Sequence, residues 1–329
     1  MGKRPKIGLA LGGGGARGLA HIGVLKVLER ERIPIDLIMG TSIGAVVGAA
    51  YAVSPDAVSL ERKVLEFFHK EGAGRSRLKR LGILHPHSPE KTDLMHRVVR
   101  IAEKHFFISQ AILKKAMVTE EDMLHVLRFF LPDISIQETA IPYAAIAVDL
   151  VSGQEVVFRE GPLIRAVRAS CAVPGFLPPV EWNRRVLVDG AVIDVVPAGA
   201  AKDAGADVVI GVDVGLGLCQ DRAIEDGIDA INRAAEIMSF HLNIQSRERA
   251  DVLIEPPVRG IEWTDFLSYE DLIREGERAA ESNLGQIRSL LHWQLGRRAL
   301  EKLRQIIMRL SRRRGKEKGP LRVFAKLLQ

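Results

Sequence analysis

The first part of the chain alternates between short apolar runs and stretches with helical spacing. Residues 6–11 (KIGLAL) and 33–39 (IPIDLIM) are compact apolar runs, which predict two buried strands. Between them, residues 18–32 carry leucine and isoleucine at helical spacing, and residues 43–53 predict a second helix, rich in small side chains. The strand–helix–strand–helix order predicts a parallel sheet that is covered by helices on both faces.

The middle of the chain has a different pattern. Residues 56–131 are charged, show helical spacing and contain paired phenylalanines, which predicts a helical cap inserted into the sheet domain. Apolar strand patterns return at 143–150 and 154–158, and again at 184–190 and 207–214. The whole order predicts the α/β class: a three-layer α/β/α sandwich with a mostly parallel central sheet.

The last third is predicted to be largely helical, over 222–248 and 269–290. Residues 286–329 hold thirteen Lys/Arg and two Glu, a net of +11, whereas the whole chain carries only +6. Apolar residues recur in this tail at helical spacing: Leu300, Leu303, Ile306, Ile307 and Leu310. This basic amphipathic pattern suits a helix lying on an anionic membrane, and it equally suits a helix docked on its own domain.

Composition and charge argue against several classes of protein. Cys171 and Cys219 are too few for a disulfide framework, fit no zinc-site spacing and suit a reducing compartment. Glycines and Arg17 interrupt the basic start, so we expect no signal peptide. The uncharged run at 37–54 contains glycines and hydroxyl side chains, so we expect no transmembrane helix. Because the positive charge belongs to the tail, we expect no nucleic-acid-binding core.

The pentapeptide GTSIG at residues 40–44 fits Gly-x-Ser-x-Gly. A strand is predicted before it and a helix after it, which is the context that a nucleophile elbow requires. On such a turn the serine is strained, and its hydroxyl projects above the free amides of the following helix. The alternative is a glycine-rich turn with an incidental serine. The pattern makes Ser42 the candidate nucleophile.

The glycine run GGGGARG at residues 12–18 has three interpretations. Its Gly-x-Gly-x-x-Gly spacing after a strand fits a dinucleotide-binding loop. A phosphate-binding P-loop is excluded, because no Gly-Lys-Ser/Thr ends the run. In the third interpretation, the bare amides of Gly13, Gly14 and Gly15 point at one small anion and form an oxyanion hole. Arg17 would then hold the loop or meet a phosphate.

Spacing along the chain favours the oxyanion hole. One crossover helix separates the glycine run from Ser42, as two neighbouring parallel strands require. Both segments would then lie at the carboxyl ends of these strands, where α/β folds place their sites. A dinucleotide fold needs an acid that closes the second strand, but Asp36 lies inside that strand. The dinucleotide site is therefore the weaker alternative.

Ser42 needs a base, and Asp189 is a better candidate than any of the nine histidines. None of these follows a recognisable strand directly: His21, His69, His85, His87, His96, His105, His125, His241 and His292. A Ser-Asp-His order could use His241. Asp189 ends a predicted strand before Gly190, so its carboxylate can face a site shared by strand ends, where desolvation raises its basicity. The alternative is a solvent-facing Asp-Gly turn.

Three other residues near strand ends attract attention. Asp149 and Asp213 follow apolar strands, and we expect a structural role for Asp149. Cys171 lies beside Pro174 and Gly175, and we expect it to be a small buried side chain rather than a reactive thiol.

Taken together, the three motif segments resemble the patatin-like phospholipases, especially their small bacterial members. The family pattern is Gly-Gly-Gly-x-Arg/Lys-Gly, then Gly-x-Ser-x-Gly, then Asp-Gly-Gly/Ala, and it corresponds to residues 13–18, 40–44 and 189–191. The stretches ASCAVPGFLPPV at 169–180 and GADVVIGVDVG at 205–215 also match. The likeness covers about 1–55 and 140–260.

The resemblance implies a serine lipid acyl hydrolase that works through an acyl-enzyme. By position, Ser42 would be the nucleophile, Asp189 the general base, and Gly13, Gly14 and Gly15 the oxyanion donors. Arg17 matches the basic position of the motif. No metal or other cofactor is implied, and the chain shows no calcium-loop pattern.

The resemblance also organises the chain. We expect a catalytic domain over 1–260, with 56–131 as its cap, and a C-terminal helical region over 261–329. The cap looks longer than that of the small bacterial members, which leaves open the choice among phospholipid, lysophospholipid and neutral lipid. Alternatives are a thioesterase, a small-ester esterase and a lipid-binding scaffold with little turnover. We expect a cytoplasmic protein that could contact the inner face of an anionic membrane through 286–329.

Overall fold

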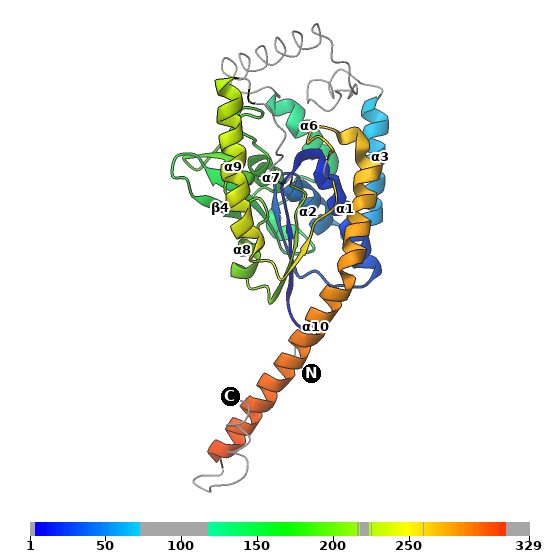
Figure 1. Ribbon diagram of the computed structural model, residues 1–329, viewed down its shortest axis with the longest axis vertical. Helices are drawn as coiled ribbons and strands as arrows, with labels where there is room; N and C mark the ends of the chain where they lie inside the picture. The colour runs from blue at the N-terminus through cyan, green and yellow to red at the C-terminus, as the bar shows by residue number, and fades with distance from the viewer. Residues whose placement is uncertain are drawn as a thin grey trace.

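The structure of the chain is a computed structural model that describes residues 4–72, 118–215, 217, 224, 226–258 and 260–313. A central sheet lies between layers of helices, and one long helix, α10 (Tyr269–Arg313), leaves the body of the molecule (Figure 1). The expected cap over 56–131 is described only at its two ends, by α3 (Ala57–Gly72) and α6 (Glu120–Phe130).

Five strands of the described sheet run parallel to one another, in the spatial order β3-β2-β1-β7-β8. Their bounds are β3 (Tyr143–Asp149), β2 (Leu37–Thr41), β1 (Ile7–Leu11), β7 (Val208–Val212) and β8 (Val252–Ile254). All residues of the first four are buried, because helices cover both faces of a parallel sheet.

The three remaining described strands, β4 (Glu155–Phe158), β5 (Val180–Trp182) and β6 (Arg185–Asp189), are antiparallel to their neighbours. Residues 145–148 of β3 pair with β4 along one edge, so β2 and β6 share the other edge. They approach along it from opposite directions: Thr41 pairs with Ile146, and Asp189 pairs with the next residue, Ala147. The carboxyl ends of β2 and β6 therefore meet head-on.

Two hydrophobic cores lie on the two faces of the sheet. Along β1, Leu9 and Leu11 face one core, whereas Ala10 faces the other. The first core holds α1 (Ala20–Arg30), α2 (Ile43–Val53), α3, α6, α7 (Leu163–Ser170) and α10. On the second face lies α8 (Ala198–Asp203), against which α9 (Gly227–Arg247) packs. The expected three-layer α/β/α fold is confirmed, with a mixed sheet.

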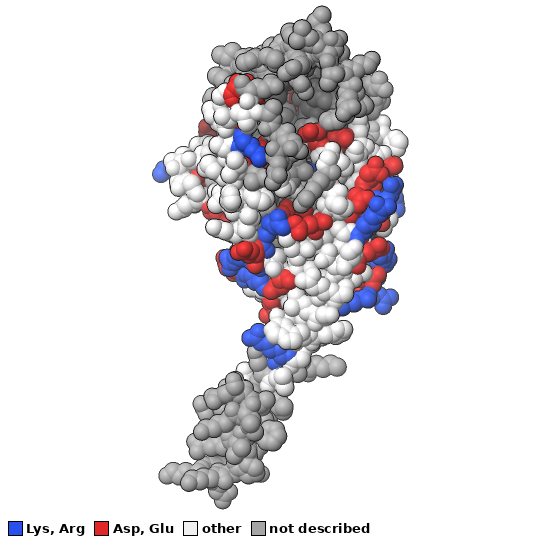
Figure 2. All heavy atoms as spheres, in the orientation of Figure 1, with Lys and Arg blue, Asp and Glu red and all other residues white. Residues whose placement is uncertain are grey.

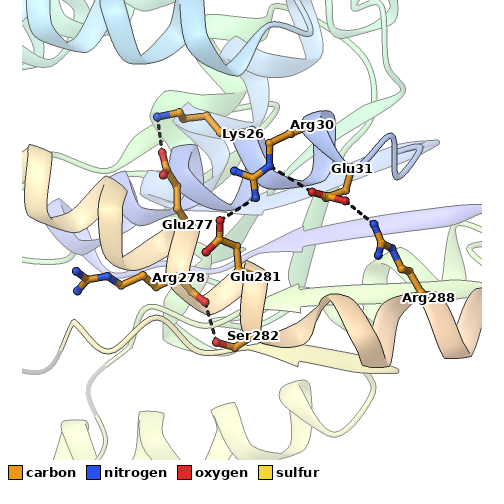
Figure 3. A network of polar contacts seen from close by, with 8 residues as sticks. All are labelled: Lys26, Arg30, Glu31, Glu277, Arg278, Glu281, Ser282 and Arg288. Atoms are coloured by element: carbon orange, nitrogen blue, oxygen red, sulfur yellow. Dashed lines mark hydrogen bonds and ion pairs between the residues drawn. The ribbon is translucent and has the colours of Figure 1, made fainter.

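The seam between α1 and α10 brings two helices into unusually close contact. A Cβ atom on Gly23 would lie 1.9 Å from the carbonyl oxygen of Ile273, and one on Gly276 would lie 1.9 Å from that of Ala20. Ion pairs flank this crossing, as Figure 3 shows: Lys26 with Glu277, Arg30 with Glu281 at 2.7 Å, and Glu31 with Arg288. Figure 2 shows acidic and basic side chains interspersed over the edge of the molecule where α10 and α3 lie.

The first half of α10, which lies in the expected C-terminal helical region, packs into the core of the fold. Leu272, Ile273, Ala280 and Ile287 of α10 are buried in the same core as β1 and α1. The first half of α10 is therefore part of the same packed body as β1 and α1.

The direction of α10 follows from its partners. Its contacts advance along α1 from Ala20 to Glu31, so the two helices run the same way, away from the carboxyl ends of the strands. After Arg288, α10 continues to Arg313, which is about 37 Å of helix at about 1.5 Å per residue. This extension projects from the end of the molecule opposite the strands' carboxyl ends (Figure 1). In the described part of the chain, every helix is too short or too polar to cross a bilayer.

Candidate active site

Ser42 stands on the sharp turn between β2 and α2, with the backbone expected of a nucleophile elbow. Its φ is 56° and its ψ is −125°, a strained conformation for a residue with a side chain. Both flanking glycines are sterically required: a Cβ on Gly40 would lie 2.5 Å from the Ala45 Cα, and one on Gly44 would lie 2.2 Å from the Leu11 carbonyl oxygen. The sequence GTSIG thus allows helix, strand and turn to approach closely.

Three hydrogen bonds hold this turn in place. The Ser42 amide donates to the hydroxyl oxygen of Ser170 at 3.0 Å, and the Thr41 hydroxyl donates to the carbonyl oxygen of Asp194 at 3.0 Å. The amide of Ala45 donates to the Ser42 carbonyl at 2.8 Å. Ser170 is fully buried at the end of α7 and was not identified from the sequence. The only sequence feature that pointed to Ser170 was its position in the stretch 169–180, which resembles the family pattern.

Asp189 is the last residue of β6 and lies where the end of β2 leads into Ser42. Its Oδ1 accepts the amide of Ala191 at 2.8 Å, and its Oδ2 is buried with no hydrogen-bond partner among the described residues. Burial raises the pKa of Asp189 to about 6, and interactions with the Ser42 hydroxyl and the Ala191 amide oppose that rise. The carboxylate therefore lies beside Ser42 and retains a free acceptor, although no hydrogen bond of ordinary geometry joins the two side chains.

The glycine loop, residues 12–16, lies against the same turn. A Cβ on Gly13 would sit 3.3 Å from the Cβ of Ser42 and 3.4 Å from that of Ala191. The structure therefore brings together three segments that are far apart in sequence: the glycine loop, the elbow and the Asp-Gly turn. A solvent-facing position for Asp189 is excluded, because this residue is only 2% exposed.

The amides of the glycine loop are not equivalent. Three of the five donate to carbonyl groups outside the loop: Gly12 to Val212 at 3.0 Å, Gly13 to Val195 at 3.0 Å, and Ala16 to Trp263 at 2.7 Å. The other two, of Gly14 and Gly15, donate to no acceptor in the described part of the chain. Of the three predicted oxyanion donors, Gly13 is thus already engaged, which leaves Gly14 and Gly15 available.

Two buried side chains bind carbonyl groups of the glycine loop. Arg17 Nε donates to the Gly14 carbonyl at 3.1 Å, and one of its terminal nitrogens has no partner among the described residues. Burial lowers the pKa of Arg17, while Glu262 and Asp213 oppose this. His21 Nε2 lies 2.8 Å from the Gly12 carbonyl oxygen. Two roles were expected for Arg17, to hold the glycine loop or to meet a phosphate, and its hydrogen bond to Gly14 corresponds to the first.

An apolar cavity of about 160 Å³ opens beside Ser42 and Gly15. The ends of the cap line much of it, with side chains from α3 and α6: Leu60, Val64, Phe67, Phe68, Met123, Val126, Leu127 and Phe130. The segment 263–266, which precedes α10, contributes Trp263 and Phe266. Neither residue was identified from the sequence as part of the site.

The other residues that the sequence suggested have structural surroundings. Asp149 accepts hydrogen bonds from the Ser152 hydroxyl at 2.7 Å and from the Val186 amide at 3.2 Å, which confirms its structural role at a strand end. Asp213 binds Arg247 at 3.1 Å. Cys171 is buried, and burial raises the pKa of its thiol, as expected for packing rather than reactivity. Cys219 lies outside the described residues.

In the described ranges, Ser42 has no histidine as hydrogen-bond partner and no metal-binding cluster is found. No hydrogen bond there joins Ser42 to a histidine, and His241 is exposed on α9. His85, His87, His96 and His105 lie outside the described residues. Across the same ranges, no group of three or more His, Cys, Asp and Glu side chains is arranged to hold a metal ion.

Comparison with known proteins places these segments in a family. Residues 9–202, which include Gly13–Gly15, Ser42 and Asp189, match the model of the patatin-like phospholipases. The patatin-like phospholipase domain-containing protein ZK370.4 of Caenorhabditis elegans is 35% identical over 213 residues, or 64% of this chain. Lysophospholipase NTE1 of Kluyveromyces lactis is 29% identical over 297 residues, or 82% of this chain.

The chain spans only 14% and 18% of the lengths of these two relatives. Among solved structures, VipD from Legionella pneumophila aligns over 87% of this chain and 67% of its own, with 15% identity and a TM-score of 0.42. The family model matches more than half of the chain and includes all three motif segments. The chain belongs to the patatin-like phospholipase family.

Proposed function

We propose that the protein is a serine lipid acyl hydrolase that uses a Ser42–Asp189 dyad. One observation carries the proposal: the strained Ser42, which lines an apolar cavity, lies beside the buried carboxylate of Asp189. One oxygen of that carboxylate has no hydrogen-bond partner among the described residues. Membership of the patatin-like phospholipase family and the similarity to a lysophospholipase support a lipid ester as substrate.

The geometry supports a two-step reaction. Asp189 takes the proton of the Ser42 hydroxyl while Oγ attacks the carbonyl carbon of the ester. The resulting oxyanion accepts hydrogen bonds from the unpaired amides of Gly14 and Gly15. The intermediate then collapses, the alcohol leaves with the proton held by Asp189, and the acyl group remains on Ser42. Water, deprotonated by Asp189, releases the fatty acid and restores the serine.

Burial gives Asp189 the basicity that this reaction needs. An ordinary aspartate is a weak base, but burial raises the pKa of Asp189 to about 6. The reactive form is the ionised carboxylate, so turnover should rise as the pH passes through about 6 and level off above it.

The cavity provides a place for the acyl chain. Its side chains are almost all apolar, and a chain attached to Ser42 through its carbonyl would extend between α2 and the ends of the cap. A long acyl chain gains more from this burial than the acyl group of a small ester does. We therefore favour a lipid acyl ester, and turnover of thioesters or short esters alone would favour the alternative enzymes.

The experiment that tests this proposal compares wild type with Ser42→Ala and Asp189→Asn, using fluorophosphonate labelling and hydrolysis of lysophospholipid, phospholipid and thioester substrates. Both variants should lose labelling and turnover, while Ser54→Ala, an exposed serine at the end of α2, should keep both. Labelling that persists in Ser42→Ala would refute the nucleophile. A wild type that binds lipid without turnover would support the scaffold alternative.

We also propose that the basic tail, residues 286–329, anchors the protein to anionic lipid. Trp293, Leu295 and Leu300 are exposed on its described part. Because α10 runs away from the carboxyl ends of the strands, where Ser42 lies, the tail would tether the enzyme rather than form the substrate entrance. Reversing the charge at Arg297, Arg298, Lys302 and Arg304 should abolish flotation with anionic liposomes and leave turnover of dispersed substrate unchanged. Undiminished flotation would refute this role.

A further inference from the structure

His21 is a buried polar side chain that the proposed reaction does not use. It lies in the first turn of α1, and its Nε2 is 2.8 Å from the carbonyl oxygen of Gly12. A carbonyl can only accept, so Nε2 carries the proton and the ring donates. Burial lowers the pKa of His21 to about 4, so the ring is neutral at physiological pH. Its Nδ1 is buried and has no hydrogen-bond partner among the described residues.

The bond from His21 restrains one particular peptide group. The carbonyl of Gly12 accepts from His21, and the amide of the same peptide, on Gly13, donates to the carbonyl of Val195 at 3.0 Å. The two groups of a trans peptide point in opposite directions, so these bonds fix the plane of the peptide from both sides. Glycines have no side chain to limit rotation, so the plane depends on such restraints.

The next peptide group carries the amide of Gly14, one of the two left without an acceptor in the described part of the chain. Arg17 restrains the peptide after that by binding the Gly14 carbonyl, so the Gly15 amide points the other way. The Gly14 amide therefore lies on a peptide between two others whose carbonyls are held by buried side chains, and the Gly15 amide belongs to the second of these held peptides. Their direction follows from His21 on one side and Arg17 on the other.

We propose that His21 is a positioning residue, whose Nε2–H holds the Gly12 carbonyl and so aims the Gly14 amide at the oxyanion formed on the substrate. The inference rests on the proposed acyl-transfer function. His21 itself touches neither substrate nor Ser42 in this role, and it transfers no proton.

The experiment uses the full-length protein and three substitutions of His21. His21→Leu removes the donor at similar volume, His21→Asn keeps a polar side chain too short to reach Gly12, and His21→Gln places an amide nitrogen near the position of Nε2. Leu28→Ala, at a fully buried position of α1, is the stability control. Each variant is assayed well below its Tm for kcat and KM on p-nitrophenyl butyrate, and for the rate of fluorophosphonate labelling.

If His21 positions the loop, the Leu and Asn variants lose about 10²-fold in kcat and in labelling rate, with KM changed less than about threefold. His21→Gln recovers at least about tenfold of that loss, and the pH dependence of kcat stays that of wild type, because Asp189 still governs it. Leu28→Ala loses Tm and keeps kcat.

Two other outcomes are decisive. Suppose that the wild type is active. If His21→Asn or His21→Leu keeps kcat as Leu28→Ala does, or if His21→Gln has no higher kcat than these two variants, the positioning role is refuted. The proposed function then still stands. If wild type neither hydrolyses esters nor labels, both inferences fall.

Discussion

Two regions of the molecule differ in how far their polar groups are paired: the loops around Ser42 leave several without partners, whereas the seam between α1 and α10 joins them in ion pairs. Around Ser42, one oxygen of Asp189 and two glycine amides lack partners within the described chain, and Ser42 has a positive φ. At the seam, Lys26, Arg30 and Glu31 all form ion pairs with α10 (Figure 3). The difference indicates that α10 secures the body of the fold, while the loops around Ser42 keep unpaired groups that a ligand could bind.

The comparison predicts that the seam tolerates no added volume at its crossing. In Gly276→Val, the new side chain would overlap the Ala20 carbonyl, whose oxygen lies 1.9 Å from the Cβ position. We expect a loss of about 3 kcal/mol or more in the free energy of unfolding, measured by urea denaturation. Gly285→Ala, on the same helix with open space around it, should be neutral or stabilising by about 0.5–1 kcal/mol. Equal effects of the two changes would show that the crossing is not closely packed.

At the reactive end, stability and activity should change in opposite directions with pH. The folded-state pKa of Asp189, about 6, lies above the ordinary value of 3.8. A raised folded-state pKa contributes stability that is fully present below about pH 4 and is lost as the pH rises through 6, amounting to about 3 kcal/mol. In the proposed mechanism turnover needs the ionised form, so it should increase over the same interval.

The measurement is the free energy of unfolding of wild type minus that of Asp189→Asn, at several pH values between 4 and 8. Asparagine does not titrate, so the difference should fall by about 2 kcal/mol across this interval, while contributions of all other groups cancel. A difference that stays constant with pH would mean that burial of Asp189 does not raise its pKa.

The ion pairs of the seam should contribute least. Glu31→Gln removes the contact with Arg288 and should cost about 0.2–1 kcal/mol at low salt, because both side chains are partly exposed. The cost should shrink in 1 M NaCl, where exposed charges are screened. A loss that salt does not reduce would indicate that Glu31 acts through packing rather than charge.

The sequence predicted the features that depend on neighbouring residues. Both early strands, the elbow at Ser42 and the glycine run with its crossover helix follow from local patterns, and their proximity follows from one short parallel crossover. The sheet position of Asp189 did not follow, because β6 pairs antiparallel with β3 and no local pattern encodes that direction. Ser170 and the segment 263–266 were missed for the same reason, since only tertiary packing brings them to the site.

The edge of β3 that β2 and β6 share fixes where the two strands deliver the residues of the proposed dyad, Ser42 and Asp189. Thr41, which precedes Ser42, pairs with Ile146, and Asp189 pairs with Ala147, so the ends of β2 and β6 are offset by one backbone repeat of about 3.3 Å along β3. A single-residue insertion in β3 would shift that register and turn the following side chains to the other face of the sheet. The proposed chemistry would therefore be lost with Ser42 and Asp189 both still present, through a change in a strand that carries neither of them.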